Sequence, residues 1–291
     1  MSDIPLIPLN SGTSIPQLGL GIWQTPDEDA ERLVRYAIHE AGYRHIDTAA
    51  AYGNETGVGR GMRTSSVPRE EIFLTTKLWN ADQGYDRALR AFDASLERLG
   101  TDYVDLYLIH WPLLDDQRIV RTWEALERIH AEGRARAIGV SNFEPRHLRL
   151  LLDRGGVVPA VNQIELHPHF PQRALRAFCA EAGIAITSWS PLGGTSNSWG
   201  PDRPNTLLGD PVIGAIAQEH GVSPAQVIVR WHLQNGLVVI PKSLHEERIA
   251  ANIDVFGFAL TPEQLAAIDG LETGVRVGGD PNAVNVGAPA D

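Results

Sequence analysis

The sequence contains almost no lysine: of its 25 basic residues only Lys77 and Lys242 are lysines, and the others are arginines. An arginine serves as well as a lysine on an exposed surface, but its planar guanidinium does not fit where a compact ammonium must shift a neighbour's pKa. The two lysines are therefore candidates for functional cations, although two lysines could also have survived by chance.

Cysteine, positive charge and long apolar runs are also scarce. The single Cys179 excludes an intramolecular disulfide and is consistent with a reducing compartment. The net charge of −11 argues against a nucleic-acid or anionic-membrane partner, because both need a basic face. The chain opens without the features of a secretory signal, and no stretch approaches the ~18 apolar residues of a membrane span. We expect a cytoplasmic protein whose partner is a small molecule.

Short apolar runs rich in β-branched residues recur along the chain, and most are separated by stretches with helical periodicity. The runs are 18–22, 43–47, 72–77, 104–110, 135–141, 160–165, 185–190 and 237–242. The helical stretches are 29–41, 86–99, 119–131, 145–152, 172–182 and 223–234. Alternation of this kind favours parallel pairing, and eight strands in a chain of this length predict an α/β fold, a closed (β/α)₈ TIM barrel.

Three stretches fall outside the repeat. Residues 6–18 resemble a small hairpin, which we expect to plug the bottom of the barrel. Residues 191–208 are polar and rich in glycine, serine and proline, as a functional loop is. After residue 254 we expect one more helix, 261–271, and an irregular tail. No change of composition marks a linker, so residues 1–291 are predicted to form a single domain.

Polar residues end most of the predicted strands. They are Asp47, Lys77, His110, Ser141, Asn142, Gln163, Glu165, Trp189, Ser190, Lys242 and Ser243. In a TIM barrel these ends meet at the rim that carries the reacting groups. Each residue could instead have a purely structural role; His110, for example, could be a core histidine whose hydrogen bonds are satisfied. Together, the structural alternatives would require several independent coincidences.

Asp47 and Tyr52 form one part of a possible proton donor. A phenol ionises only near pH ~10, but a neighbouring ammonium lowers its pKa, and a carboxylate can hold that ammonium in place. The missing third part is then a lysine from elsewhere in the chain. The alternative is that Asp47 caps a turn and Tyr52 packs at an edge.

The ordered motifs resemble those of the aldo-keto reductases over nearly the whole chain. The matching pieces are 21–23, 45–49, Tyr52, 53–55, 74–79, 105–112, 138–143, 162–165, 188–193 and 239–243. Trp189 and the tail 276–281 with Asn285 are similar to the bacterial 2,5-diketo-D-gluconate reductase branch of that family. The resemblance implies reduction of aldehydes or ketones, including dicarbonyls and keto sugars or acids, by hydride from NADPH.

The resemblance also implies roles for individual residues. In the tetrad Asp47, Tyr52, Lys77 and His110, Tyr52 would donate the proton, Lys77 would lower its pKa, Asp47 would anchor Lys77, and neutral His110 would orient the carbonyl. Cofactor-binding positions are Gly21, Ile22, Trp23, Asp47, Ser141, Asn142, Gln163, Trp189, Ser190, Leu192, Lys242, Ser243, Arg248 and Asn252. Substrate-binding positions are Trp23, Tyr52, Trp79, His110 and Trp111, although Trp79 could simply fill the barrel mouth.

Two departures from the family pattern concern the ends of the site. Ala251 stands where relatives often have glutamate, so one hydrogen bond to adenine is in question. The C-terminal tail is shorter than in mammalian relatives, which would leave one wall of the substrate pocket open.

Lys242, Ser243 and Arg248 could bind an adenosine 2′-phosphate, which favours NADPH over NADH. Alternatively, Lys242 pairs with Glu246 on the surface.

Two other classes of function compete with the reductase. His167 and His169 could be ligands in a barrel metallohydrolase, but the first strand supplies no further histidine, and we expect no metal. A nucleotide-binding sensor without activity is the second alternative, although it would not need a tuned phenol. We expect a monomeric enzyme.

Overall fold

The computed structural model describes residues 4–194 and 206–288. Its centre is an eight-stranded parallel sheet in which each strand pairs with the next along the chain. The strands are β3 (Leu20–Gly21), β4 (His45–Asp47), β5 (Phe73–Leu78), β6 (Val104–Ile109), β7 (Ala135–Ser141), β8 (Val161–Glu165), β9 (Ala185–Trp189) and β10 (Val238–Val239).

The first and last strands close the sheet into a barrel. The backbone N–H of Gly19 donates to the carbonyl of Val239 at 2.9 Å, and the N–H of Val239 donates to the carbonyl of Gln17 at 2.9 Å. The N–H of Gly21 reaches the carbonyl of Pro241 at 3.1 Å. The predicted (β/α)₈ barrel is therefore confirmed, with β3 and β10 shorter than the predicted runs because regular pairing there covers only two residues each.

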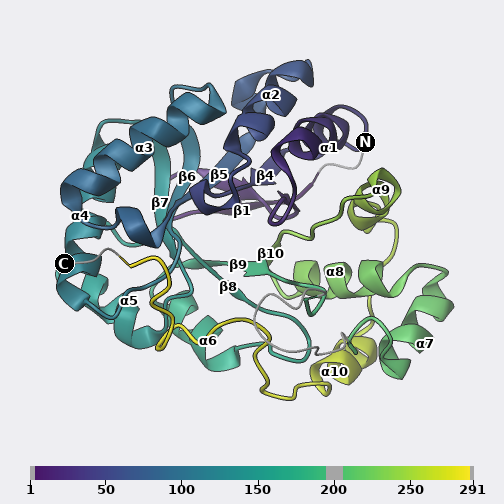
Figure 1. Cartoon of the computed structure of the whole chain (residues 1–291). Helices are drawn as coiled ribbons and strands as arrows, with labels where there is room; N and C mark the ends of the chain where they lie inside the picture. Colours follow the sequence, from purple (N-terminus) through teal and green to yellow (C-terminus); the bar gives the residue numbers. More distant parts are fainter. Residues whose placement is uncertain (1–3, 195–205, 289–291) are drawn as a thin grey trace.

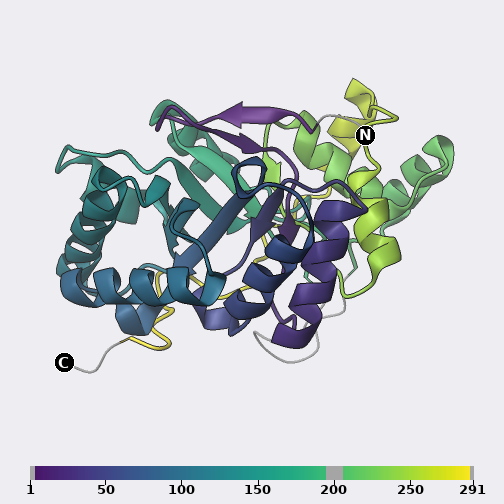
Figure 2. The same cartoon turned by 90° about the horizontal axis from the view of Figure 1, so that it is seen from above.

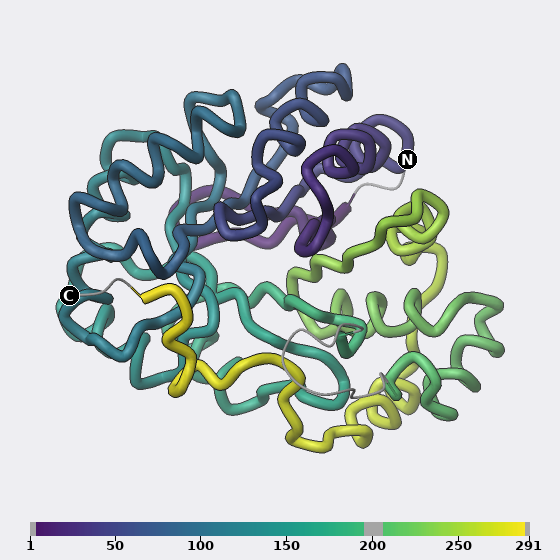
Figure 3. Tube along the Cα trace, in the orientation of Figure 1, coloured from purple at the N-terminus to yellow at the C-terminus, as the bar shows by residue number. Residues whose placement is uncertain are grey.

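Helices surround the strands (Figures 1 and 3). They are α1 (Asp27–His39), α2 (Glu55–Thr64), α3 (Tyr85–Leu99), α4 (Asp116–Ala131), α5 (Pro145–Leu152), α6 (Arg173–Glu181), α7 (Pro211–His220), α8 (Pro224–Gln234), α9 (Glu246–Ile253) and α10 (Pro262–Asp269). Each predicted helix is present within a few residues of its expected bounds. Helix α7 was not predicted, because its apolar residues are too numerous to show one clear face. In the predicted polar loop 191–208, residues 195–205 lie outside the described residues.

The antiparallel hairpin of β1 (Leu6–Pro8) and β2 (Ser14–Pro16) crosses one end of the barrel, as expected (Figure 2). Ile15 on β2 is fully buried and belongs to the same interior cluster as Leu106 and Val161. The described part of the C-terminal tail, up to residue 288, reaches the opposite end of the barrel (Figure 2).

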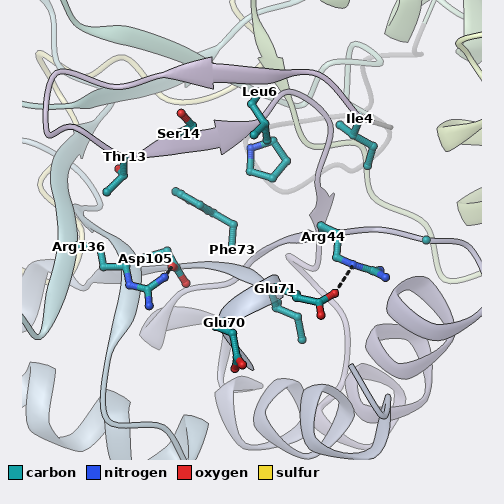
Figure 4. Close-up of a pocket in the computed structure, with 13 residues that line it drawn as sticks. Ile4, Leu6, Thr13, Ser14, Arg44, Glu70, Glu71, Phe73, Asp105 and Arg136 are labelled. Atoms are coloured by element: carbon teal, nitrogen blue, oxygen red, sulfur yellow. Dashed lines mark hydrogen bonds and ion pairs between the residues drawn. The ribbon is translucent and has the colours of Figure 1, made fainter. Parts of the chain in front are cut away.

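A cavity of about 800 Å³ lies between this hairpin and the barrel floor (Figure 4). Its charged side chains face one another: Arg136 pairs with Asp105 at 3.0 Å and Arg44 with Glu71 at 4.0 Å. It is separate from the polar residues that end the strands. None of the helices in the described part of the chain is long and apolar enough to span a bilayer.

Candidate active site

A cavity of about 670 Å³ opens at the carboxyl ends of the strands. Most of the predicted site residues line it: Gly21, Ile22, Trp23, Asp47, Tyr52, Trp79, His110, Trp111, Ser141, Asn142, Gln163, Trp189, Ser190, Leu192 and Lys242. Lys77 lies beneath its floor, while Ser243, Arg248 and Asn252 lie beyond it, before and within α9. The cavity is also lined by Gln24, Ala51, Pro191, Gly194 and Ile240, which were not predicted.

Lys77 lies at the centre of a group of hydrogen-bonded side chains beneath the floor of the cavity. It is the last residue but one of β5, and its side chain is wholly buried. Its Nζ donates to Oδ1 of Asp47 at 2.5 Å, to the carbonyl of Thr48 at 2.9 Å and to the hydroxyl of Tyr52 at 3.3 Å. An ammonium has three protons, so these three contacts use all of its donors. Burial lowers the pKa of Lys77, but attraction to Asp47 and Tyr52 outweighs it, and the net pKa is raised.

Two opposing effects act on the pKa of Tyr52. Burial raises the pKa of the phenol above its ordinary value, and the opposing effect of Lys77 only offsets part of that rise. Lys77 lowers the pKa of Tyr52, as predicted, but the net pKa stays above the ordinary value. The reason is that the side chains packed around the hydroxyl remove it from water and so disfavour the phenolate. A phenol of raised pKa remains protonated at neutral pH, as a proton donor must.

His110 follows β6 and faces Tyr52. Their rings meet edge to face, with centroids 5.6 Å apart, and Trp79 contacts the histidine in the same way at 5.3 Å. Burial, followed by repulsion from Lys77, lowers the pKa of His110 well below its usual range. The ring is therefore neutral at physiological pH, as predicted, and its Nδ1 has no hydrogen-bond partner among the described residues.

Three amide and hydroxyl side chains from β7 and β8 lie beside this group. Gln163 Nε2 donates to the second carboxylate oxygen of Asp47 at 2.7 Å. Ser141 donates to the carbonyl of Gln163, and Asn142 donates to the carbonyl of His110 at 3.0 Å. Asn142 has a left-handed backbone conformation, with φ of 64°, which asparagine tolerates better than most residues. Gln163 thus touches the tetrad itself, which the sequence did not indicate.

Trp189 ends β9 and forms a side wall of the cavity. Its indole N–H donates to Oδ1 of Asn142 at 2.8 Å, and its ring centroid lies 6.3 Å from that of Trp111. The C-terminal tail packs behind it: a Cβ added to Gly278 would come within 2.4 Å of the Trp189 ring. Asn142 therefore fixes the edge of the Trp189 ring, and Gly278 of the tail packs against the ring.

The tail also reaches the wall that we expected to be open. Glu165, a buried carboxylate at the end of β8, accepts from the backbone N–H groups of Val277 at 2.5 Å and Gly278 at 2.8 Å. Further along, Asn80 donates to the carbonyl of Val286 at 2.8 Å, beside Trp79. The described part of the tail thus covers both tryptophans in spite of its shortness. The polar end of β8 was a sequence signal for Glu165, but its partners in the tail were not.

Lys242 lies half-buried at the other end of the cavity, and burial lowers its pKa. The alternative partner, Glu246, binds Arg32 on α1 instead, and Lys242 makes no ion pair with any described residue. The Ser243 hydroxyl accepts from the N–H of His245, while Arg248 is exposed on the first turn of α9. The residues fit NADPH. Lys242 is a half-buried cation for a phosphate, Trp189 offers an indole wall for a flat ring, and the buried amides of Asn142 and Gln163 lie at the far end of the cavity.

The proposed metal ligands do not form a site. His167 contacts Glu165 through Nε2 at 3.1 Å, and its ring centroid is 6.4 Å from that of His169. Within residues 4–194 and 206–288 no group of three or more potential ligand side chains converges.

Comparisons with known proteins agree with this geometry. Residues 14–273 match the Aldo/keto reductase family. The chain is 58% identical over 281 residues to an aldo-keto reductase of Mycolicibacterium smegmatis, with 97% of this chain and 98% of that protein covered. It is 53% identical over 290 residues to morphine 6-dehydrogenase of Pseudomonas putida, with 99% and 98% covered.

A solved structure extends the comparison to three dimensions. The crystal structure of a mutant of Gox0644 in complex with NADPH superimposes with a TM-score of 0.89 at 47% identity, over 97% of this chain and 99% of that one. The chain therefore belongs to the aldo/keto reductase family and is an NADPH-dependent oxidoreductase that acts on carbonyl groups.

Proposed function

We propose that Tyr52 is the proton donor of carbonyl reduction. The observation that supports this most directly is the buried Lys77 ammonium, shared between Asp47, Thr48 and Tyr52. When bound, NADPH supplies the hydride that the carbonyl carbon accepts. The carbonyl oxygen takes the proton of the Tyr52 hydroxyl, and the phenolate that remains is stabilised by Lys77 at 3.3 Å.

His110 has a separate role in this proposal. Because it is neutral, it can donate one N–H hydrogen bond to the carbonyl oxygen without competing with Tyr52 as an acid. Its edge-on contacts with Tyr52 and Trp79 fix the plane of the ring. Substrate would therefore lie against Tyr52 and His110, between Trp23, Trp79 and Trp111.

The cofactor would lie along the rest of the cavity. Ser141, Asn142 and Gln163 are the polar groups for the nicotinamide carboxamide, and Trp189 offers an indole face to the ring. Gly21, Ile22, Trp23, Ser190 and Leu192 line the middle. Lys242, Ser243 and Arg248 would bind the adenosine 2′-phosphate, with Asn252 toward the adenine.

The charge of the lining indicates the class of substrate. Lys242 is the only lysine or arginine among the described residues that line the cavity, and it lies at the proposed adenosine end. The substrate end presents tryptophan rings, a neutral histidine and a protonated phenol. A carboxylate buried there would find no cation, which is costly. We propose that neutral aldehydes, ketones and dicarbonyls are preferred to keto acids.

Three narrower assignments accompany this function. The chain would belong to the 2,5-diketo-D-gluconate reductase branch, on the basis of Trp189 and the tail 276–281 with Asn285, although the charge argument favours uncharged substrates. It would act as a monomer, because one chain supplies every residue of the site. It would work in the cytoplasm, which suits its single buried thiol.

The substitution Tyr52→Phe tests the proton donor. It removes one hydroxyl and leaves the ring that contacts His110, so folding and NADPH binding should be retained. Reduction of an aldehyde at saturating NADPH should fall by roughly 10²–10⁴-fold, the usual contribution of general acid catalysis. A phenylalanine enzyme with near-wild-type turnover would contradict the assignment.

A further inference from the structure

Asn54 joins the two loops that carry Tyr52 and Trp23. Its side chain is fully buried. The amide nitrogen donates to the carbonyl oxygens of Ile22 at 3.0 Å and Thr25 at 2.8 Å. The amide oxygen accepts from the hydroxyl of Thr48 at 2.9 Å. We propose that Asn54 is a positioning residue for the reduction, because it fixes the Tyr52 hydroxyl relative to the wall formed by Trp23.

The turn that carries Tyr52 packs against β5 without a backbone hydrogen bond to it in the described structure. It is the short 3₁₀ turn Ala50–Tyr52, followed by Gly53 in the left-handed conformation with φ of 67°. Its backbone hydrogen bonds are local, from Tyr52 to Ala49 at 3.0 Å and from Gly53 to Ala50 at 3.3 Å. Such a turn can shift as a unit unless its ends are held. Thr48 and Asn54 stand at those two ends and bind each other.

The Trp23 loop depends on the same amide. The carbonyls that Asn54 binds belong to the residues on both sides of the segment Trp23–Gln24. Gln24 has φ of 55°, a conformation that costs free energy in a residue other than glycine and persists only when its surroundings hold it. Without the amide donors, two carbonyl oxygens beside this strained turn lose a buried partner.

Glu55 provides the second attachment of the same segment. It is 1% exposed and binds the hydroxyl of Thr76 at 2.6 Å and Nε of Arg98 at 2.7 Å. Thr76 immediately precedes Lys77 on β5. Asn54 and Glu55 therefore connect the Tyr52 turn to both neighbouring strands: to Ile22, which directly follows β3, and to Thr76 on β5.

The test is Asn54→Asp, which keeps the shape and the acceptor for Thr48 but puts a carboxylate oxygen opposite two carbonyl oxygens. We expect kcat to fall roughly 10- to 100-fold, the effect of displacing a reacting group by about 1 Å. The affinity for NADPH, measured by fluorescence, should change much less, because Lys242 and Arg248 are untouched. A purely structural role would instead lower the melting temperature and leave kcat per folded molecule unchanged.

Asn10→Asp is a matched control. The Asn10 amide nitrogen also donates to two carbonyl oxygens, those of Pro159 and Gly183 at 3.1 Å each, but at the hairpin end of the barrel. It adds the same charge and should leave kcat unchanged. If Asn54→Asp does not fold, Thr48→Val removes only the hydrogen bond to the amide oxygen. It should still lower kcat several-fold, and an unchanged kcat would overturn the proposal.

The inference rests on the proposed role of Tyr52, and a double-mutant cycle separates the two. In a Tyr52→Phe background, Asn54→Asp should cause little further loss of turnover, because the group that it positions is gone. Additive losses would show that Asn54 does not act through Tyr52. A full-rate Tyr52→Phe enzyme would overturn the proton donor, whereas a full-rate Asn54→Asp enzyme beside an inactive Tyr52→Phe enzyme would overturn only the positioning role.

Discussion

Gln163 Nε2 lies 2.7 Å from Oδ2 of Asp47, the carboxylate whose other oxygen binds Lys77. One amide, proposed to bind the nicotinamide, thus also holds the group that anchors the lysine. A hydrogen bond to a charged partner contributes about 1.5–3 kcal/mol. Loss of this contact should therefore affect the proposed proton donor, Tyr52, as well as cofactor binding.

The change Gln163→Met separates these effects, since it keeps the length of the side chain and removes both polar groups. We expect weaker NADPH binding and also a lower kcat at saturating NADPH, by roughly tenfold. Gln17→Met is the control, because Gln17 is a buried glutamine that binds the carbonyl of Leu233, away from the site. A change in NADPH affinity alone would mean that the contact with Asp47 has no catalytic importance.

Lys77 is predicted to be irreplaceable by either an apolar or a larger cationic residue. Lys77→Met leaves Asp47 buried without its cation, and Lys77→Arg places a planar fork where three separate acceptors surround a point charge. Both should reduce kcat by orders of magnitude. Steady-state assays together with circular dichroism would show whether folded protein is present. Substantial turnover in the arginine variant would argue against the need for a compact ammonium.

The discrimination between NADPH and NADH should depend on Lys242 and Arg248. The double change to alanine removes two cations, each able to make a charge-assisted hydrogen bond worth ~1.5–3 kcal/mol. NADPH should bind at least tenfold more weakly, while NADH should be almost unaffected. Fluorescence titration measures both, and Arg128→Ala, on the distant helix α4, controls for the loss of surface charge. Equal weakening of the two cofactors, or of neither, would refute the phosphate site.

The lack of a cation at the proposed substrate end of the cavity, among the described residues, predicts discrimination by substrate charge. Methyl 4-formylbenzoate and 4-formylbenzoate present the same aldehyde and differ only in a distant ester or carboxylate. We expect a clearly higher kcat/KM for the ester, because the carboxylate would enter a wall of tryptophan side chains without a cation. Comparable values for the two aldehydes would show that the charged end remains in water or finds a cation outside the described residues.

Acid should destabilise the fold through buried histidines. Burial lowers the pKa of both His45 and His232 from 6.5 to about 4. The unfolded chain then binds protons between these values that the folded chain excludes, so the free energy of unfolding should decrease as pH falls from 6.5 toward 4. Each histidine can contribute up to about 3 kcal/mol. Urea unfolding at several pH values measures the slope, and it should be smaller in His232→Gln than in the wild type.

The barrel and the order of its strands could be predicted because both depend on local patterns. Apolar runs bounded by glycine and helices that begin at Ser223 and Thr261, both with capping boxes in the structure, are visible in short stretches of the chain. The carboxyl ends of parallel strands must share one rim, so the sequence is enough to predict that Asp47, Lys77 and His110 lie together. Helix α7 was missed because it lacks a distinct polar face.

What the sequence alone determined is the set of candidate functional side chains and the edge of the barrel at which most of them meet. The tertiary structure decided how they pair: Gln163 with Asp47, Glu165 with the tail, and Asn54 with the Trp23 loop. It also decided the direction of the Tyr52 pKa, because desolvation depends on everything packed around the hydroxyl and not on the neighbouring residues in the chain. Contacts between residues far apart in sequence leave no local pattern, since a hydrogen bond requires only that two atoms are brought within about 3 Å of each other.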